Sequence, residues 1–170
     1  DLAPEIRGAL AEPTGVSDHP WKRFILRPLD DPATLALLQQ PHAASHFVNG
    51  PLTSDHLIRC KPWPLWIDDP SRIREAVQRY RDDYRAYFQR HAASLEAGGE
   101  PFYPSPRVIL MPGMGGFIAG ENVYLADIAR DITRQTLRVK ADIAAMGTYL
   151  GLDVRQLFDM EYFSLQHAKL

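Results

Sequence analysis

Apolar and polar positions follow two periods along this chain, and both predict regular structure. Apolar side chains recur every three or four residues in segments that are therefore expected to be helical: 32–48, 71–93 and 122–146. Shorter apolar segments predict strands, and these are 22–28, 57–67 and 107–111. Helices that alternate with strands favour a layered α/β/α domain, with three or more helices packed on a small sheet.

The two long predicted helices each carry an apolar stripe that should face the core. In the segment 71–93 the stripe comprises Ile73, Val77, Tyr80, Tyr84, Tyr87, Phe88 and His91. In the segment 122–146 it comprises Leu125, Ile128, Ile132, Thr136, Val139, Ile143 and Met146. Charged side chains, Arg81 among them, are expected on the remaining faces.

A cluster of glycines lies between the strand at 107–111 and the helix at 122–146. The cluster comprises Gly113, Gly115, Gly116 and Gly120. A strand, a glycine loop and a helix are the parts of a phosphate-binding turn. The spacing fits neither the dinucleotide fingerprint nor the P-loop, and Glu121 places a carboxylate where phosphate would lie. A tight strand-to-helix turn is therefore favoured over a phosphate or nucleotide site, whose candidate residues are Gly113, Gly115, Gly116 and Asn122.

Three histidines and one cysteine are the next candidates for chemistry. His56 has Asp, Arg and Lys neighbours, a setting that suits acid–base work or anion binding, and equally a helix cap with solvated charges. His42 and His46 are four residues apart, so a helix would put them on one face, but the spacing suggests no third metal ligand. Two surface histidines are the favoured interpretation. Cys60 has no partner motif and nothing that marks it as a nucleophile.

Composition and charge are those of an ordinary globular domain. Of 170 residues, 45% are hydrophobic and 24% charged, and the net charge of −2 comes with both signs interspersed. This argues against binding to nucleic acid or anionic lipid, and no apolar run approaches the roughly 20 residues of a membrane span. The single cysteine fits a reducing compartment, so a cytoplasmic location is expected. The chain is interpreted as one domain, 1–170, of a longer protein, with 152–170 as a tail that leads to a following domain.

The stretch from Arg107 to about Met146 resembles the class II aldolase/adducin family. In that family a buried strand runs into a His-Gly turn, a short apolar strand, a glycine and a long alanine-rich helix. Here the same order is found in the segments 108–111, 112–113, 114–119, Gly120 and the helix that follows. The segment LTSDHLI at 52–58 also looks like the Leu-Thr-Pro-Asp/Glu sequence that precedes a strand in that family.

A closer likeness covers roughly residues 20–170. The chain is similar to bifunctional aldolase/short-chain dehydrogenase proteins of the rhamnulose-1-phosphate aldolase type. The similar segments are TSDHLIR at 53–59, Lys61, PLWID at 64–68, DYRAYF at 83–88, PRV at 106–108, PG at 112–113, FDMEY at 158–162, SLQ at 164–166 and AKL at 168–170. In that family the tail lies just before the dehydrogenase domain. The resemblance implies flanking domains as partners, a sugar-phosphate substrate, and zinc and NAD(P) as cofactors of the longer protein.

The departures from the family bear on metal binding. Class II aldolases bind a divalent metal, usually zinc, through a His-x-His pair and a third His in the His-Gly turn, and the metal stabilises the enediolate of C–C cleavage. This chain has no His-x-His, and the third position falls on Pro112, which has no donor side chain. A catalytic zinc site needs about three protein ligands, so no metal ligands and no cofactor are expected in this chain. It would be a degenerate second copy or the C-terminal half of an aldolase unit.

Three functions are compatible with these patterns. The first is a supporting domain of a sugar-phosphate lyase/dehydrogenase, inactive alone, that supplies support, oligomer contacts or substrate-binding residues. The second is a structural or homo-oligomerisation domain. The third is a phosphate- or nucleotide-binding module that uses the segment 113–122. For the first, Arg59, Lys61 and Arg107 are candidates to bind a sugar phosphate, because they are cationic and lie near predicted strand ends.

Overall fold

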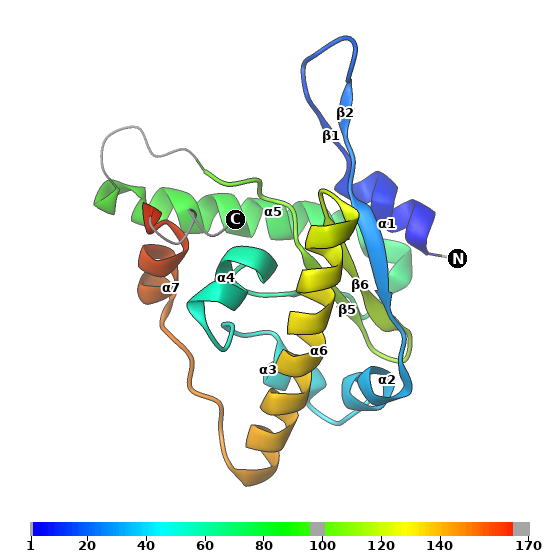
Figure 1. The fold of residues 1–170 in the computed structure, drawn as a ribbon, viewed down its shortest axis with the longest axis vertical. Helices are drawn as coiled ribbons and strands as arrows, with labels where there is room; N and C mark the ends of the chain where they lie inside the picture. Colours follow the sequence, from blue (N-terminus) through cyan, green and yellow to red (C-terminus); the bar gives the residue numbers. More distant parts are fainter. Residues whose placement is uncertain (1, 96–100, 165–170) are drawn as a thin grey trace.

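Four strands form one mixed sheet in the computed structural model, which describes residues 2–95 and 101–164 (Figure 1). The order across the sheet is β3 (Ile25–Leu29), β6 (Gly115–Gly120), β5 (Val108–Met111) and β4 (Leu65–Trp66). β6 pairs antiparallel with both β3 and β5, whereas β4 pairs parallel with β5. A ribbon of β1 (Glu12–Pro13) and β2 (Trp21–Lys22) projects beyond the sheet (Figure 1).

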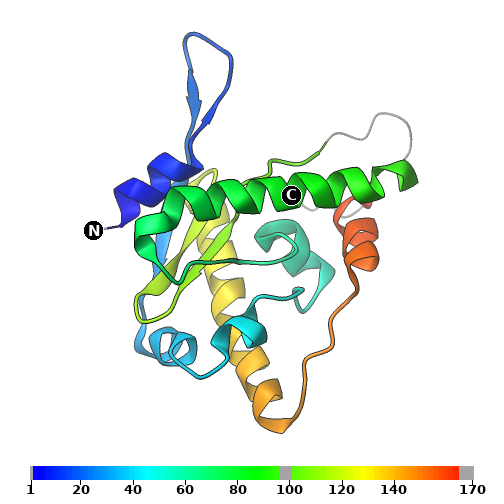
Figure 2. The same cartoon turned by 180° about the vertical axis from the view of Figure 1, so that it is seen from behind.

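Helices cover both faces of this sheet, which confirms the predicted layered α/β/α fold. One face carries α6 (Val123–Met146), α2 (Pro32–Leu38), α3 (Ala43–Phe47) and α4 (Ser54–Cys60). The opposite face carries α1 (Ala3–Leu10) and α5 (Ile73–His91), as the reverse view shows (Figure 2). Short helical turns at Pro70–Arg72 and Ala92–Ser94 flank α5. The last helix, α7 (Val154–Glu161), packs against α4 and α5.

Alternation along β5 divides the core into two clusters. Ile109 and Met111 belong to the cluster with α1 and α5, whereas Val108 and Leu110 belong to the cluster with α6. Successive side chains of a strand point to opposite faces. A strand covered on both sides therefore needs an uninterrupted apolar run, which is the pattern found at 108–111.

The prediction of a strand over 57–67 is wrong for most of its length. Residues 54–60 form α4, because Thr53 accepts a hydrogen bond from the backbone N–H of His56 and so caps a helix there. Only Leu65–Trp66 is strand. Pro62 and Pro64 remove two backbone donors, which confines the extended part to a short edge strand.

The glycine cluster is a hairpin turn followed by a strand, so the prediction of a strand-to-helix loop is also wrong. Gly113 lies in the turn with φ of 75°, where a side chain would be strained. Gly115 has φ of 88°, and a Cβ on it would lie 2.1 Å from the carbonyl oxygen of Leu29. A Cβ on Gly116 would lie 2.3 Å from the carbonyl oxygen of Ile109. These glycines allow strands to approach, and the strand that the resemblance implied at 114–119 is present as β6.

The buried face of α6 is rotated from the predicted stripe. Its buried residues are Ala126, Ala129, Thr133, Leu137 and Lys140. Leu125, Ile132 and Thr136 instead line hollows that they share with α4. The cause is the close approach of α6 to β6, where a Cβ on Gly120 would lie 2.7 Å from the Cα of Ala126. Only small side chains fit between a helix and a strand at that distance.

The apolar stripe of α5 is largely confirmed, with one polar exception. Ile73, Val77, Tyr80, Tyr84 and Tyr87 are buried as predicted. Arg81 is buried as well, against expectation, because its guanidinium lies 2.9 Å from Glu12 and donates to the carbonyl oxygen of Leu10. A buried cation needs such partners.

The predicted tail begins as helix α7, whose Phe158 is fully buried. The resemblance segments at 165–166 and 168–170 lie outside the described residues. Within the part of the chain that the structure covers, no helix is both long and apolar enough to cross a bilayer.

We expect Gly120→Ala to lower the free energy of unfolding by about 2 kcal/mol, because the added methyl would collide with the backbone of α6. Gly147→Ala is the matched control, because a Cβ there has no neighbour within 4 Å and the residue has extended backbone. Its effect should stay within about 0.5 kcal/mol. Urea denaturation of both variants measures this, and equal stabilities would contradict the close approach of α6 and β6.

Candidate functional site

Arg59 and Arg107, two of the predicted anion-binding residues, line one hollow of about 210 Å³. Arg59 lies near the C-terminal end of α4, and Arg107 precedes β5. The remaining wall comes from Ile58, the end of β6 at Ala119 and Gly120, and the start of α6 at Glu121 and Leu125. The fold therefore places two guanidinium groups beside the N-terminal end of a 24-residue helix, where the helix dipole favours negative charge.

One carboxylate already lies in this hollow. Glu121 Oε1 is 3.1 Å from the guanidinium of Arg107 and 3.1 Å from the ammonium of Lys22. Burial alone would raise the pKa of Glu121, but the hydrogen bond from Lys22 and the charge of Arg107 lower it below its usual value. Arg107 and Lys22 thus hold one ionised carboxylate at this hollow, and Arg59 brings a second guanidinium to its wall. Guanidinium groups are suited to bind an anionic group.

Lys61, the third predicted cation, is buried in a separate place. Its ammonium lies 3.7 Å from Oε1 of Glu161 and 3.8 Å from the ring centroid of Tyr84. The Tyr84 hydroxyl donates a 2.8 Å hydrogen bond to the same carboxylate oxygen. Burial lowers the pKa of Lys61 to about 8 and raises the pKa of Glu161. Each charge is costly to bury alone, so the two depend on each other.

This Lys61–Glu161 pair joins segments that carry the sequence resemblance. Lys61 follows α4, Tyr84 lies on α5, and Glu161 is the last residue of α7. Lys61 also has φ of 72°, a conformation that costs free energy in a residue with a side chain and persists only where its surroundings enforce it. The geometry makes the pair an anchor that holds α7 on the domain. Sequence reasoning missed Glu161, although it lies within the FDMEY segment that was singled out.

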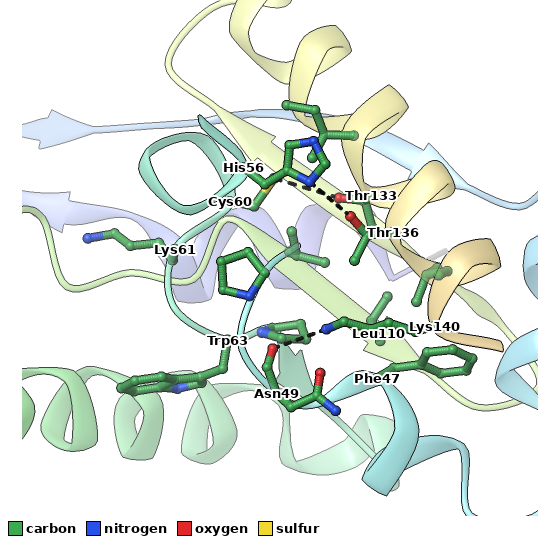
Figure 3. Close-up of a pocket in the computed structure, with 15 residues that line it drawn as sticks. Phe47, Asn49, His56, Cys60, Lys61, Trp63, Leu110, Thr133, Thr136 and Lys140 are labelled. Atoms are coloured by element: carbon green, nitrogen blue, oxygen red, sulfur yellow. Dashed lines mark hydrogen bonds between the residues drawn. The ribbon is translucent and has the colours of Figure 1, made fainter. Parts of the chain in front are cut away.

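His56 and Cys60 line a second, smaller cavity of about 40 Å³ between α4 and α6 (Figure 3). His56 Nδ1 is 3.4 Å from the hydroxyl of Thr136, and burial lowers the His56 pKa despite the nearby charge of Asp55. The neutral imidazole is thus favoured, which is the form that accepts a proton. Burial raises the pKa of Cys60 to about 12, so its thiol is protonated and a poor nucleophile.

The size of this cavity limits what it holds. A volume of about 40 Å³ is enough for a water molecule, whereas pockets for small metabolites have roughly 300 Å³ or more. In Figure 3 the ammonium of Lys61 points away from the cavity, and the ammonium of Lys140 points to the carbonyl oxygen of Asn49. The acid–base role of His56 stays a prediction, and the cavity as it stands has no room for a sugar phosphate.

The other predicted residues have structural roles. Asn122 accepts a 2.9 Å hydrogen bond from the backbone N–H of Leu125 and is the N-cap of α6. Gly113 lies in the hairpin turn, and Gly115 and Gly116 lie in β6, whose backbone groups serve the ladders to both neighbours. Among the described residues, no three His, Cys, Asp or Glu side chains are grouped so that they would hold a metal ion.

We expect Glu161→Gln to destabilise the protein by about 3 kcal/mol, because it leaves the Lys61 ammonium buried without its countercharge. Glu75→Gln on α5 is the control: it removes ion pairs to Arg72 and Arg79 that are exposed to solvent, and it should leave the stability nearly unchanged because water screens such pairs. Chemical denaturation is the measurement. Adding Lys61→Met to Glu161→Gln should recover part of the loss, and a further loss of similar size would contradict the buried pair.

Comparisons with known proteins agree with the fold and the sequence resemblance. The family model described as "Aldolase class II, second domain" matches residues 1–170. A relative from Bacillus subtilis (strain 168), named uncharacterized oxidoreductase YuxG, is 28% identical over 179 residues, which are 99% of this chain and 24% of the relative. The chain thus spans about a quarter of the length of that relative. No solved structure matches. Because the family model matches the chain throughout, this protein belongs to the family of class II aldolase second domains.

Proposed function

We propose that this chain is a supporting domain of a sugar-phosphate aldolase that is joined to a dehydrogenase, and that it supplies phosphate-binding side chains instead of metal ligands. The observation that carries the proposal is the convergence of Arg59 and Arg107 on one hollow beside the start of α6. Guanidinium groups are well suited to bind a phosphate through paired hydrogen bonds. The family match supports the aldolase half, and the name of the Bacillus relative supports an oxidoreductase half.

The residues of this chain do not fit the metal site of a class II aldolase. The sequence has no His-x-His, and the position of the third ligand is Pro112, which follows β5 directly. Zinc, and NAD(P) for the dehydrogenase, would therefore be held by other parts of the longer protein. This chain would orient the phosphate end of the substrate, and by that binding contribute to the affinity for substrate and not to the bond cleavage itself.

The assay for this proposal is aldolase activity of the full-length protein with a phosphorylated sugar. Arg59→Gln and Arg107→Gln should each raise KM about tenfold or more, since each removes a charge-assisted hydrogen bond to the phosphate. The effect on kcat should be small, because the reacting carbon atoms lie away from the phosphate. Arg85→Gln is the control, because Arg85 is exposed on α5 and pairs with Asp82 one turn away on the same helix.

An unchanged KM in both arginine variants would overturn the phosphate-binding role. A fall in kcat without a change in KM would assign these arginines to the chemical step instead. Binding of phosphate or nucleotide by the segment 113–122 alone is the weaker alternative, because its glycines serve strand approach in β6.

A contribution to homo-oligomer contacts is the second candidate function, and exposed apolar side chains favour it. Met146 is 82% exposed and Leu150 is 88% exposed, and Leu152 and Val154 nearby are also exposed. Large apolar side chains gathered in one exposed segment are typical of interaction surfaces. We propose that the segment 146–154 contacts a second copy of the protein.

Sedimentation of the full-length protein tests this second function. The double variant Met146→Ser/Leu150→Ser should shift the sedimenting species to lower mass, because it removes apolar area from the contact. Tyr124→Ser is the control, since Tyr124 is 72% exposed at the opposite end of α6. A double variant that sediments like the unaltered protein would exclude this segment as the contact.

A further inference from the structure

Lys140 is a buried cation for which the described residues provide no carboxylate. Its exposed fraction is 2%, and it lies on the buried face of α6. Its ammonium donates one hydrogen bond of 3.2 Å to the carbonyl oxygen of Asn49. The ring centroid of Tyr149 lies 5.0 Å away. A single carbonyl and an aromatic face offset only part of the cost of taking an ammonium out of water.

A comparison with Lys61 shows that Lys140 lacks a carboxylate partner among the described residues. Both lysines are buried, but the ammonium of Lys61 has the carboxylate of Glu161 at 3.7 Å. For Lys140, none of the ion pairs found in the described part of the chain supplies an equivalent partner. Burial lowers the pKa of Lys140 to about 8, and no opposing charge raises it. The ammonium form still predominates at neutral pH, so a positive charge is available to an anion.

The surroundings of Lys140 form a polar hollow of about 290 Å³. Its wall includes the polar residues Ser45, His46, Asn49, Lys140, Thr148 and Tyr149. These residues come from α3, the C-terminal part of α6 and the segment that follows it. Asn49 and Tyr149, the two partners of the ammonium, both belong to this wall. The ammonium therefore lies at the edge of a space whose volume is close to the lower end of the range for small-metabolite pockets.

Two further polar atoms in the residues of this wall have no hydrogen-bond partner among the described residues. His46 Nδ1 and Asn49 Oδ1 are buried, and neither has a hydrogen bond to any described residue. Buried polar atoms are nearly always hydrogen-bonded in native proteins. An unsatisfied histidine nitrogen, an unsatisfied amide oxygen and an ammonium without a carboxylate occur together at one hollow. A bound molecule would satisfy all three if it carried a negative charge for Lys140 and a hydrogen-bond donor for Asn49 Oδ1, which as an amide oxygen only accepts.

We propose that this hollow is an anion-binding site, in which Lys140 binds the phosphate or carboxylate group of a small metabolite. Either group would supply the missing negative charge and accept hydrogen bonds from the ammonium. The site goes beyond the phosphate-binding role of Arg59 and Arg107, because it shares no wall residue with their hollow. The sequence did not predict this site, because His46 is interpreted there as a surface histidine and Lys140 belongs to no motif.

The test is hydrogen–deuterium exchange of the full-length protein, read by mass spectrometry, with inorganic phosphate, malonate or potassium chloride at equal ionic strength. Phosphate or malonate should slow exchange at 43–50 and 144–150 relative to chloride, because a bound anion would hold α3 and the end of α6 together. The anion that acts at the lower concentration identifies the preferred group. Absence of slowing with both anions at 50 mM, a concentration far above the roughly millimolar Kd of a weak site, would overturn the proposal.

Two variants test whether Lys140 causes the slower hydrogen–deuterium exchange. Lys140→Met keeps the length of the side chain and removes the charge, and it should weaken the response at least about tenfold. Arg138→Gln is the control, because Arg138 is exposed on the same helix. Slowing that persists in Lys140→Met would refute the site. Should this variant fail to fold, the comparison of phosphate, malonate and chloride on the unaltered protein still decides the outcome.

Hydrogen–deuterium exchange and the aldolase assay together distinguish this site from the proposed function. Arg59→Gln and Arg107→Gln should leave the response at 43–50 and 144–150 intact, since they line a different hollow. In the aldolase assay, Arg59→Gln and Arg107→Gln should raise KM by the same factor whether or not Lys140→Met is also present. If the anions fail to slow exchange while the arginine variants still raise KM, the site at Lys140 is wrong. If the exchange slows but KM does not change in the arginine variants, the phosphate-binding role of Arg59 and Arg107 is wrong.

Discussion

The close approach of α6 to β6 is the constraint on which the rest of the structure depends. Gly120 and Ala126 touch at a distance that excludes a side chain on the glycine. The helix must therefore turn its small residues, Ala126 and Ala129, toward the sheet. Its larger aliphatic side chains are displaced sideways toward α4, where they line the hollows between the two helices. The hollows at this face are thus a consequence of how tightly helix and strand pack.

Buried charges decide how the remaining elements attach to this centre. Lys61 and Glu161 connect the end of α4 to the end of α7, and Arg81 with Glu12 connects α5 to the N-terminal ribbon. Each pair satisfies charges that are costly to bury alone. Lys140 differs because, among the residues that the structure describes, its ammonium has a carbonyl and a ring as partners, and for that reason we propose a ligand there.

Two positively charged places lie at opposite ends of α6. Arg59 and Arg107 lie near its start, and Lys140 lies in its C-terminal half. The helix dipole strengthens the first place, since its positive end is there, whereas the second depends on burial, which strengthens any charge interaction. The proposed supporting role in an aldolase and the proposed site at Lys140 therefore rest on different physical causes. Evidence against one of these two proposals would therefore not count against the other.

The sequence by itself determined the alternation of helices and strands, the layered fold, the apolar stripe of α5 and the strand at 108–111. These follow from local periodicity and from burial on both faces of a strand. It also carried the resemblance to class II aldolases, which the family match confirmed. The tertiary structure alone decided that the strand at 115–120 lies inside the sheet, between β3 and β5, that α6 presents its small face to the sheet, and that Lys61 and Lys140 are buried. Those features depend on distances between segments far apart in the chain, and local periodicity contains no information about such distances.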